Sequence, residues 1–98
     1  MSAFNVVRFR TKPGRAEEFI EAHRKAAADW PGLKHANLVQ IGERGFCLIA
    51  EWKDEKSLVA ARPKMVEALN SFRDCLEVIS PKLGVTAPMS GPVVLKMK

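Results

Sequence analysis

The sequence predicts an α+β fold of the ferredoxin-like type, with the element order β-α-β-β-α-β and two helices on one face of a four-stranded antiparallel sheet. Three observations support this prediction: four runs rich in β-branched and aromatic residues, two segments with apolar residues three or four apart, and turn-forming Pro and Gly residues between them. The 98 residues suit one domain that spans residues 1–98.

The first half of the chain is expected to form a strand, a helix and a second strand. The first strand covers Ala3–Arg10 and ends at a Lys-Pro-Gly turn. The helix begins near Arg15, has two glutamates in its first turn, and ends at the Pro-Gly pair of residues 31–32. Its predicted apolar face consists of Ala16, Phe19, Ile20, His23, Ala26, Ala27 and Trp30. The second strand covers residues 33–41.

A Gly-bounded hairpin turn leads into the third strand, which covers residues 46–52 and is the most strand-like stretch of the chain. Asp54 is expected to cap a long second helix, with Ser57 as the alternative start. The predicted apolar stripe of this helix consists of Leu58, Arg62, Met65, Leu69, Phe72, Leu76 and Ile79.

The end of the chain contains the Pro residues that limit this second helix. Pro63 predicts a break or kink near residues 61–62, and the Ser-Pro pair of residues 80–81 is expected to end the helix. A loop over residues 86–92 is then expected to lead into a last strand over residues 93–97.

Both faces of the predicted sheet carry apolar side chains. Alternation places Phe4 and Val6 of the first strand on one face, and Val7 and Phe9 on the other. The third strand divides in the same way, into Phe46, Leu48 and Trp52 on one face and Cys47 and Ile49 on the other. Two helices cover only one face, and a bare apolar face is costly at about 25 cal/mol per Å². We therefore predict a homodimer through the sheet face.

Charge and hydropathy argue against nucleic acid and membranes as partners. The net charge is +5, but Lys and Arg alternate with Asp and Glu, and no basic run of five residues occurs. No apolar run approaches the roughly 18 residues that span a bilayer, and the first residues lack the layout of an export signal. We expect a cytoplasmic protein that binds neither nucleic acid nor membrane.

The cysteines and histidines predict no metal site. Cys47 and Cys75 lie in apolar stretches and are expected to be free thiols, since their spacing matches no metal or redox motif. His35 follows a turn and is expected to be exposed and isolated. The sequence shows no catalytic triad, paired carboxylates or phosphate-binding loop.

The stretch VVRFRTKPGRAEEFIEAHR, followed by PGL, AEW and SGPVV, resembles the antibiotic biosynthesis monooxygenase family of the dimeric α/β barrel superfamily. The resemblance covers nearly the whole chain. It implies a dimeric α/β barrel, in which two sheets pack face to face and each subunit holds a cavity between sheet and helices. Members of the family include haem-degrading enzymes and cofactor-independent monooxygenases that act on quinols and polycyclic phenols. In the latter, the ionised substrate itself reduces oxygen, so no cofactor is expected.

The sequence also departs from that family. Its enzymes that act on aromatic polyketides or haem often place an Asn just before the Arg of the first strand, where this chain has Val7; Asn5 lies two residues earlier, on the same face. Haem-degrading members use a Trp and a His on the second helix, but the matching Trp position is Ala61 and this helix contains no His. Haem degradation is therefore not expected.

Two polar residues on the apolar helix faces are the candidate catalytic residues. His23 is a candidate base for a phenolic proton, and Arg62 is a candidate partner for an anionic enolate or carboxylate. The alternative is that His23 sits at the edge of its stripe and that Arg62 extends its stem over the core. The candidate ligand-binding residues are Phe19, Trp30, Met65, Leu69 and Phe72, with packing in the core or at an interface as the alternative role.

These observations leave several functions open. The first hypothesis is a cofactor-independent monooxygenase that oxidises a hydrophobic phenol or quinol between sheet and helices. The second is a non-catalytic, small-ligand-binding or stress-related dimer of the same fold, which a cavity below about 300 Å³ would favour. An RNA-binding module would need an exposed sheet face. Other chemistries of dimeric α/β barrels, such as lactone isomerisation, also remain open because fold does not fix function.

Overall fold

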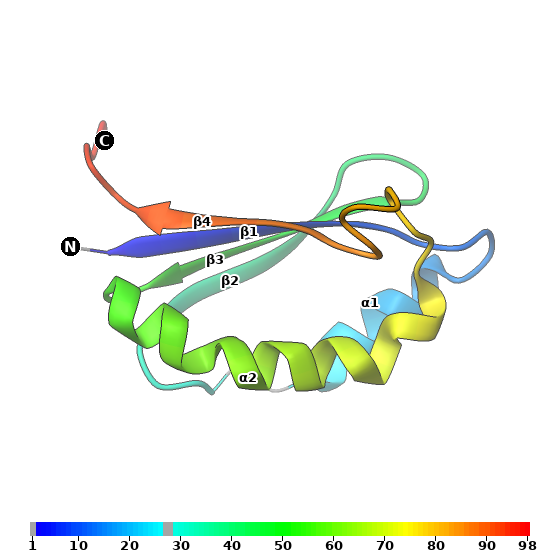
Figure 1. The fold of residues 1–98 in the computed structure, drawn as a ribbon, viewed down its shortest axis with the longest axis horizontal. Coiled ribbons are helices and arrows are strands. Elements are labelled where there is room, and N and C mark those ends of the chain that lie inside the picture. Colours follow the sequence, from blue (N-terminus) through cyan, green and yellow to red (C-terminus); the bar gives the residue numbers. More distant parts are fainter. Residues whose placement is uncertain (1, 27–28) are drawn as a thin grey trace.

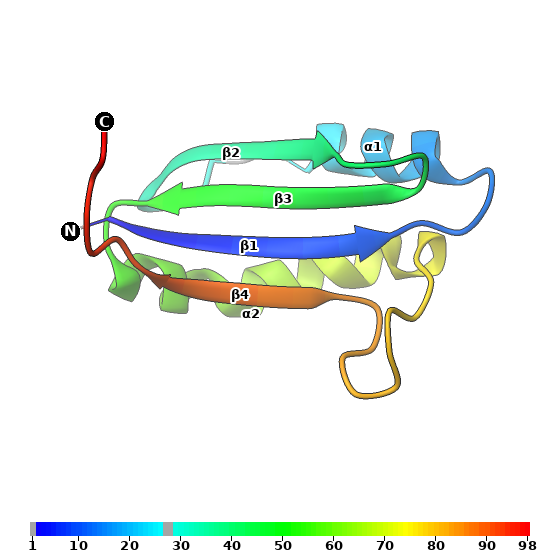
Figure 2. The same cartoon turned by 90° about the horizontal axis from the view of Figure 1, so that it is seen from above.

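The computed structural model describes residues 2–26 and 29–98 and confirms the predicted β-α-β-β-α-β order (Figure 1). The strands are β1 (Ala3–Arg10), β2 (Leu33–Gln40), β3 (Gly45–Trp52) and β4 (Ala87–Pro92). They form an antiparallel sheet in the order β2-β3-β1-β4. Helices α1 (Ala16–Lys25) and α2 (Glu55–Phe72) lie under one face of this sheet. Figure 2 looks onto the opposite face, over which no helix of the described residues lies.

The alternation along β1 and β3 is as predicted. Ala3, Asn5, Val7 and Phe9 of β1 face the helices, and Val7 pairs with Leu48 of β3. The other face, which we call the outer face, carries the half-buried Phe4, Val6, Cys47 and Ile49. In the register of the sheet, Val39 of β2 and Met89 of β4 belong to this face and are exposed. Each of the four strands therefore contributes at least one apolar side chain to the outer face, which also carries the polar Arg8, Asn37 and Glu51.

Helix α1 begins where expected but ends earlier. It follows Gly14, whose positive φ of 76° suits glycine, and it has Glu17 and Glu18 in its first turn. It ends at Lys25, and Ala26 already has an extended backbone. The prediction that Trp30 belongs to this helix is wrong, because a residue that precedes a proline disfavours the helical conformation. Ala27, predicted on the same face, lies outside the described residues.

Helix α2 begins with the predicted cap and continues through its proline. The Asp54 carboxylate accepts a hydrogen bond from the Ser57 backbone N–H at 2.7 Å. Of the break or kink predicted near residues 61–62, the break is wrong, since α2 is continuous from Glu55 to Phe72. Pro63 and Val59, four residues earlier, are both exposed, so water can bind the carbonyl that the proline leaves without a partner.

The predicted end of α2 is also wrong. The helix stops at Phe72, a 3₁₀ turn covers Arg73–Cys75, and Leu76 leaves the helix to form a β-bridge with Thr11. The backbone N–H groups of Lys12 and Glu77 donate to the Cys75 and Arg10 carbonyls, at 2.7 and 2.8 Å. These bonds to the end of β1 replace the helical hydrogen bonds that the apolar stripe predicted.

The last strand lies earlier than predicted. β4 covers Ala87–Pro92, most of the expected loop, whereas the expected strand over 93–97 lies outside it. β4 contains Pro88 and Pro92, and proline lacks a backbone N–H to donate to a neighbouring strand. The strand forms at the edge of the sheet, beside β1, where proline is tolerated.

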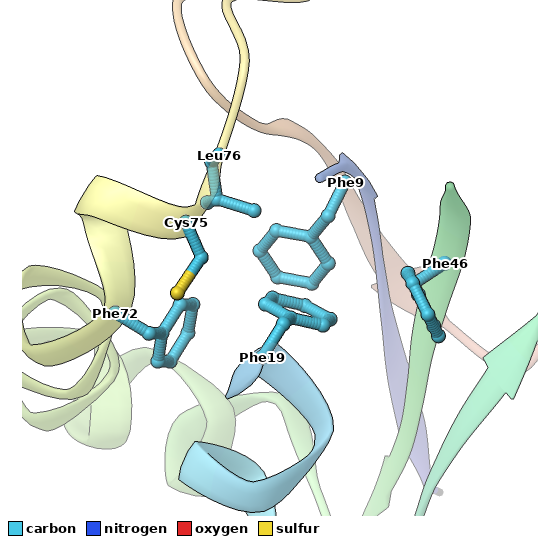
Figure 3. Packing of buried hydrophobic residues seen from close by; sticks show 6 residues of the cluster. All are labelled: Phe9, Phe19, Phe46, Phe72, Cys75 and Leu76. Atoms are coloured by element: carbon cyan, nitrogen blue, oxygen red, sulfur yellow. The ribbon is translucent and has the colours of Figure 1, made fainter. Parts of the chain in front are cut away.

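Two clusters of buried residues join the helices to the sheet. Around Phe19, which is 0% exposed, the first cluster packs Phe9, Phe46, Phe72, Cys75 and Leu76 (Figure 3). The Phe19 ring lies 5.1, 5.0 and 5.4 Å from the rings of Phe9, Phe46 and Phe72, measured between centroids. The second cluster consists of Ala3, Ala50, Trp52, Leu58 and Ala61. The clusters hold opposite ends of β1 and leave its middle less tightly covered.

Neither α1 nor α2, the α-helices of the described residues, is long and apolar enough to cross a lipid bilayer.

Replacing Phe19 should destabilise the fold strongly. Phe19→Ala removes the ring through which α1 contacts α2 and the sheet, and we expect a loss of about 3–5 kcal/mol in the free energy of unfolding. Val59→Ala on the exposed face of α2 is the control and should stay within about 0.5 kcal/mol of the wild type. Urea unfolding measures both, and equal losses in the two variants would contradict this description of the core.

Candidate functional site

A cavity of about 580 Å³ lies between the helix-covered face of the sheet and α2. Its lining includes side chains from the middle of β1, from β2 and β3, and along α2 from Leu58 to Phe72. The volume lies within the range of about 300–1,000 Å³ that is typical of small-molecule sites. Most of the lining is apolar, and its only ionisable side chains among the described residues are His23 and Arg62.

The structure places most of the predicted site residues around this cavity. Trp30, Met65, Leu69 and Phe72 line it, together with the two candidate catalytic residues. Phe19 differs from the expectation, because it is fully buried in the first cluster and does not line the cavity. Phe19 packs between His23 and the core, so it holds His23 in position without contacting the cavity itself.

At one end of the cavity, His23 is held among aromatic rings. Its imidazole centroid lies 4.5 Å from the ring centroids of both Phe19 and Phe72, and 6.0 Å from that of Phe9. Nδ1 is 3.0 Å from the Phe19 carbonyl oxygen. Since a carbonyl only accepts, Nδ1 carries the proton, and in the neutral ring Nε2 is left with a free lone pair. Burial lowers the pKa of His23 below its ordinary value, which favours this neutral form.

At the other end, Arg62 reaches from α2 across to β4. Its Nη2 donates to the Ser90 hydroxyl oxygen at 3.3 Å. Arg62 is exposed, so its guanidinium stays hydrated at the rim of the cavity. Ser90 is the register partner of Asn5, which places this contact beside the start of β1.

The same end contains a buried polar pair that the sequence analysis did not include among the site residues. Trp52 Nε1–H donates to Asn5 Oδ1 at 2.7 Å, and the two side chains are 1% and 6% exposed. The Trp52 ring also stacks on Trp30, with centroids 6.2 Å apart. The signal for this pair was the one polar side chain, Asn5, in the otherwise apolar helix-facing series of β1.

His23 and Arg62 are not brought together. The His23 end lies at Phe9 and Phe72, whereas the Arg62 end lies at Asn5. Asn5 and Phe9 are about 13 Å apart along the strand, and Arg62 and Phe72 are about 15 Å apart along the helix. The two candidate residues therefore face different parts of any ligand that fills the cavity.

Neither of the two cysteines lines the cavity. Both are free; Cys47 lies on the outer face, and Cys75 is buried with its Sγ–H donating to Glu18 Oε2 at 3.1 Å. Burial raises the pKa of the Cys75 thiol, and its hydrogen bond to Glu18 adds to this effect. His35 is exposed on β2, as predicted.

Comparison with known proteins gives a family match and a set of similar folds. The family model described as antibiotic biosynthesis monooxygenase matches residues 2–63, more than half of the chain. No curated protein matches the chain.

Three solved structures illustrate the likeness in fold. SnoaB, a cofactor-independent oxygenase from Streptomyces nogalater, is 17% identical with a TM-score of 0.75, over 98% of this chain and 96% of its own. A conserved protein from Methanosarcina mazei Go1 is 19% identical with a TM-score of 0.76, over 94% and 92% of the two chains. PA3566 from Pseudomonas aeruginosa is 15% identical with a TM-score of 0.72, over 96% and 95%. At these identities the likeness establishes the fold alone.

The burial of His23 predicts a stability that falls on mild acidification. Its pKa is lowered in the folded chain, so below about pH 6.5 the unfolded state binds more protons than the folded state. The contribution of His23 is fully present above that pH and is lost as the pH falls through the folded pKa. His23→Gln should reduce the loss of unfolding free energy between pH 7 and pH 5, measured by urea titration. The exposed His35→Gln is the control, and an equal reduction in both variants would refute this description of His23.

Proposed function

This chain belongs to the antibiotic biosynthesis monooxygenase family, and on that premise we propose that it is a cofactor-independent monooxygenase that oxidises a hydrophobic phenol or quinol. The observation that carries this proposal is an apolar cavity of about 580 Å³ that is lined at one end by the His23 imidazole, whose pKa is lowered by burial. The description of SnoaB, a chain of similar fold, as a cofactor-independent oxygenase adds support.

The cavity suits a flat aromatic substrate. Trp30, Met65, Leu69 and Phe72 provide apolar walls from which a bound ring displaces water, and aromatic rings favour such stacked or edge-on contacts. A dry site also strengthens the hydrogen bonds and charges that act on the substrate. The protein's main tasks in this reaction are to bind the ring, ionise its hydroxyl and keep water out.

His23 is the proposed base. In a bound phenol whose hydroxyl faces Nε2, the free lone pair accepts the hydroxyl proton, while the Nδ1–H bond to the Phe19 carbonyl holds the ring in place. An ordinary phenol has a pKa near 10, well above that of His23. We therefore expect the substrate to be a phenol or quinol whose hydroxyl is acidified by conjugation.

The proposed oxidation balances without an external reductant. O₂ forms a C–O bond at a ring carbon of the phenolate that carries hydrogen, and that hydrogen leaves as a proton. The O–O bond then breaks; one oxygen atom remains as the new carbonyl of a quinone, and the other leaves as water with the two protons. The ring loses four electrons and O₂ gains four. The role proposed for Arg62 is to stabilise negative charge at the far end of the substrate, away from His23.

We also propose that the active form is a homodimer through the outer face. The half-buried Phe4, Val6 and Ile49, together with the exposed Val39 and Met89, place apolar side chains on all four strands of this face, beside the polar Arg8, Asn37 and Glu51. A surface of this kind is unfavourable in water, and a second copy of the same sheet matches it in shape and chemistry. Such packing gives the dimeric α/β barrel that the family resemblance implies.

Oxygen uptake tests the proposed reaction. We expect the purified, metal-stripped protein to consume O₂ above the buffer rate with at least one member of a panel of quinols and polycyclic phenols. His23→Gln should lower this rate by about 10²- to 10⁴-fold, the usual contribution of a general base, whereas His35→Gln should leave it unchanged. Binding of the panel compounds without any oxygen uptake would favour a non-catalytic ligand-binding module instead.

The molar mass in solution tests the dimer. Light scattering should give twice the chain mass for the wild type and the chain mass for Val6→Asp, because Val6 lies between Ile49 and Met89 on the outer face. Val59→Asp on the exposed side of α2 is the control and should remain dimeric. Far-UV circular dichroism shows whether each variant is folded. A monomeric wild type would contradict the proposed assembly directly.

A further inference from the structure

The orientation of the Asn5 amide follows from its partner. The indole N–H of Trp52 can only donate, so the amide atom that faces it must be the oxygen, at 2.7 Å. The amide nitrogen, Nδ2, then points away from Trp52 with two donor hydrogens. The hydrogen bond therefore fixes which end of the Asn5 amide is available for a further partner.

Asn5 Nδ2 has no acceptor within hydrogen-bonding distance among residues 2–26 and 29–98. Among the same residues, every side-chain nitrogen or oxygen that is fully enclosed has a hydrogen-bond partner. Since Asn5 Nδ2 has none, this atom is not fully enclosed and can be reached by solvent or a ligand. The residue is 6% exposed and lines the cavity. An unpaired amide donor in such a place is costly unless a ligand or water accepts its hydrogen bond.

The charge at this end of the cavity is positive and uncompensated. Arg62 has no carboxylate partner in the described part of the chain, and its observed contact is to the neutral Ser90 hydroxyl. None of the described residues that line the cavity is acidic. A guanidinium and an amide donor that converge on one apolar space are suited to an oxygen that carries negative charge.

We propose that the Asn5–Arg62 end of the cavity is an oxyanion subsite, which binds a carboxylate or a charged, ring-conjugated carbonyl oxygen at the end of the ligand remote from His23. This inference rests on the proposed function, because it takes the same cavity as the ligand site. Trp52 is a positioning residue here: it holds the Asn5 amide with its donors toward the ligand.

The subsite narrows the class of substrate. Its distance from the His23 end, about 13 Å along β1, requires an elongated molecule with oxygen at both ends and an apolar body between them. In a phenol conjugated to such a carbonyl, loss of the hydroxyl proton at His23 moves negative charge toward Asn5 and Arg62. The Asn5 and Arg62 donors would then stabilise the anion and lower the pKa of the phenolic hydroxyl. The two ends of the cavity would thus act on one delocalised anion.

Two biphenyls that differ at one end test the subsite. The probe 4′-hydroxybiphenyl-4-carboxylate has the hydroxyl and the carboxylate at opposite ends, and 4-hydroxybiphenyl lacks only the carboxylate. Binding is followed at pH 8 by quenching of the Trp30 and Trp52 fluorescence. We expect the wild type to bind the carboxylate probe at least about tenfold more tightly than 4-hydroxybiphenyl, as is typical of a hydrogen bond to a charged group.

Variants of Asn5 and Arg62 then test whether these two residues cause the preference for the carboxylate probe. Asn5→Asp keeps an oxygen for Trp52 but replaces the donor with a charge that repels the probe, and Arg62→Gln removes the positive charge. Each should reduce the affinity for the carboxylate probe by about tenfold or more and leave that for 4-hydroxybiphenyl within about twofold. Lys64→Gln, an exposed position of α2 that does not line the cavity, is the matched control and should change neither.

The outcomes separate this inference from the proposed function. If 4-hydroxybiphenyl binds but the carboxylate adds nothing, or if the variants weaken both probes equally, the subsite is refuted while the oxygenase proposal stands. If the carboxylate preference and its loss in the variants are observed without oxygen uptake by any phenol, the subsite stands and the oxygenase proposal fails. Failure of both probes to bind would refute the subsite as well.

Discussion

The structure depends on how two helices are held against one face of a four-stranded sheet. Phe19 and its neighbours fix one end of β1 to both helices, and Trp52 with Leu58 fixes the other end to α2. Between these two clusters the sheet and α2 are not in close contact, and the cavity of about 580 Å³ occupies that space. The same arrangement leaves the outer face uncovered, so both the proposed ligand site and the proposed dimer follow from a single packing constraint.

The sequence predicted those parts of the fold that local patterns determine. The alternation in β1 and the Asp54 cap are set by neighbouring residues, and both are confirmed. The predictions for Leu76 and for the last strand were wrong because contacts distant in sequence decide them. Leu76 pairs with Thr11 instead of continuing a helix, and the Pro-containing β4 is stabilised by the edge of β1. Periodicity contains no information about such partners.

The candidate site was predictable to a similar extent. The helical stripes identified His23 on the apolar face of the first helix and Met65, Leu69 and Phe72 on that of the second, and all four line the cavity. The pairing of Asn5 with Trp52 joins residues 47 positions apart and requires the register of β1 on β3. The separation of His23 from Arg62 likewise depends on how α2 lies along the sheet. Only the structure therefore shows that the candidate residues line one cavity, with the His23 imidazole at one end and the Asn5 and Arg62 donors at the other.

A crystal structure with bound 4′-hydroxybiphenyl-4-carboxylate tests the central claim most directly, because it shows both ends of the cavity at once. The hydroxyl should lie within hydrogen-bonding distance of His23 Nε2, and the carboxylate within hydrogen-bonding distance of Asn5 Nδ2 and the Arg62 guanidinium. A probe bound in the reverse direction, or outside the space between the sheet and α2, would contradict the proposed roles of His23, Asn5 and Arg62.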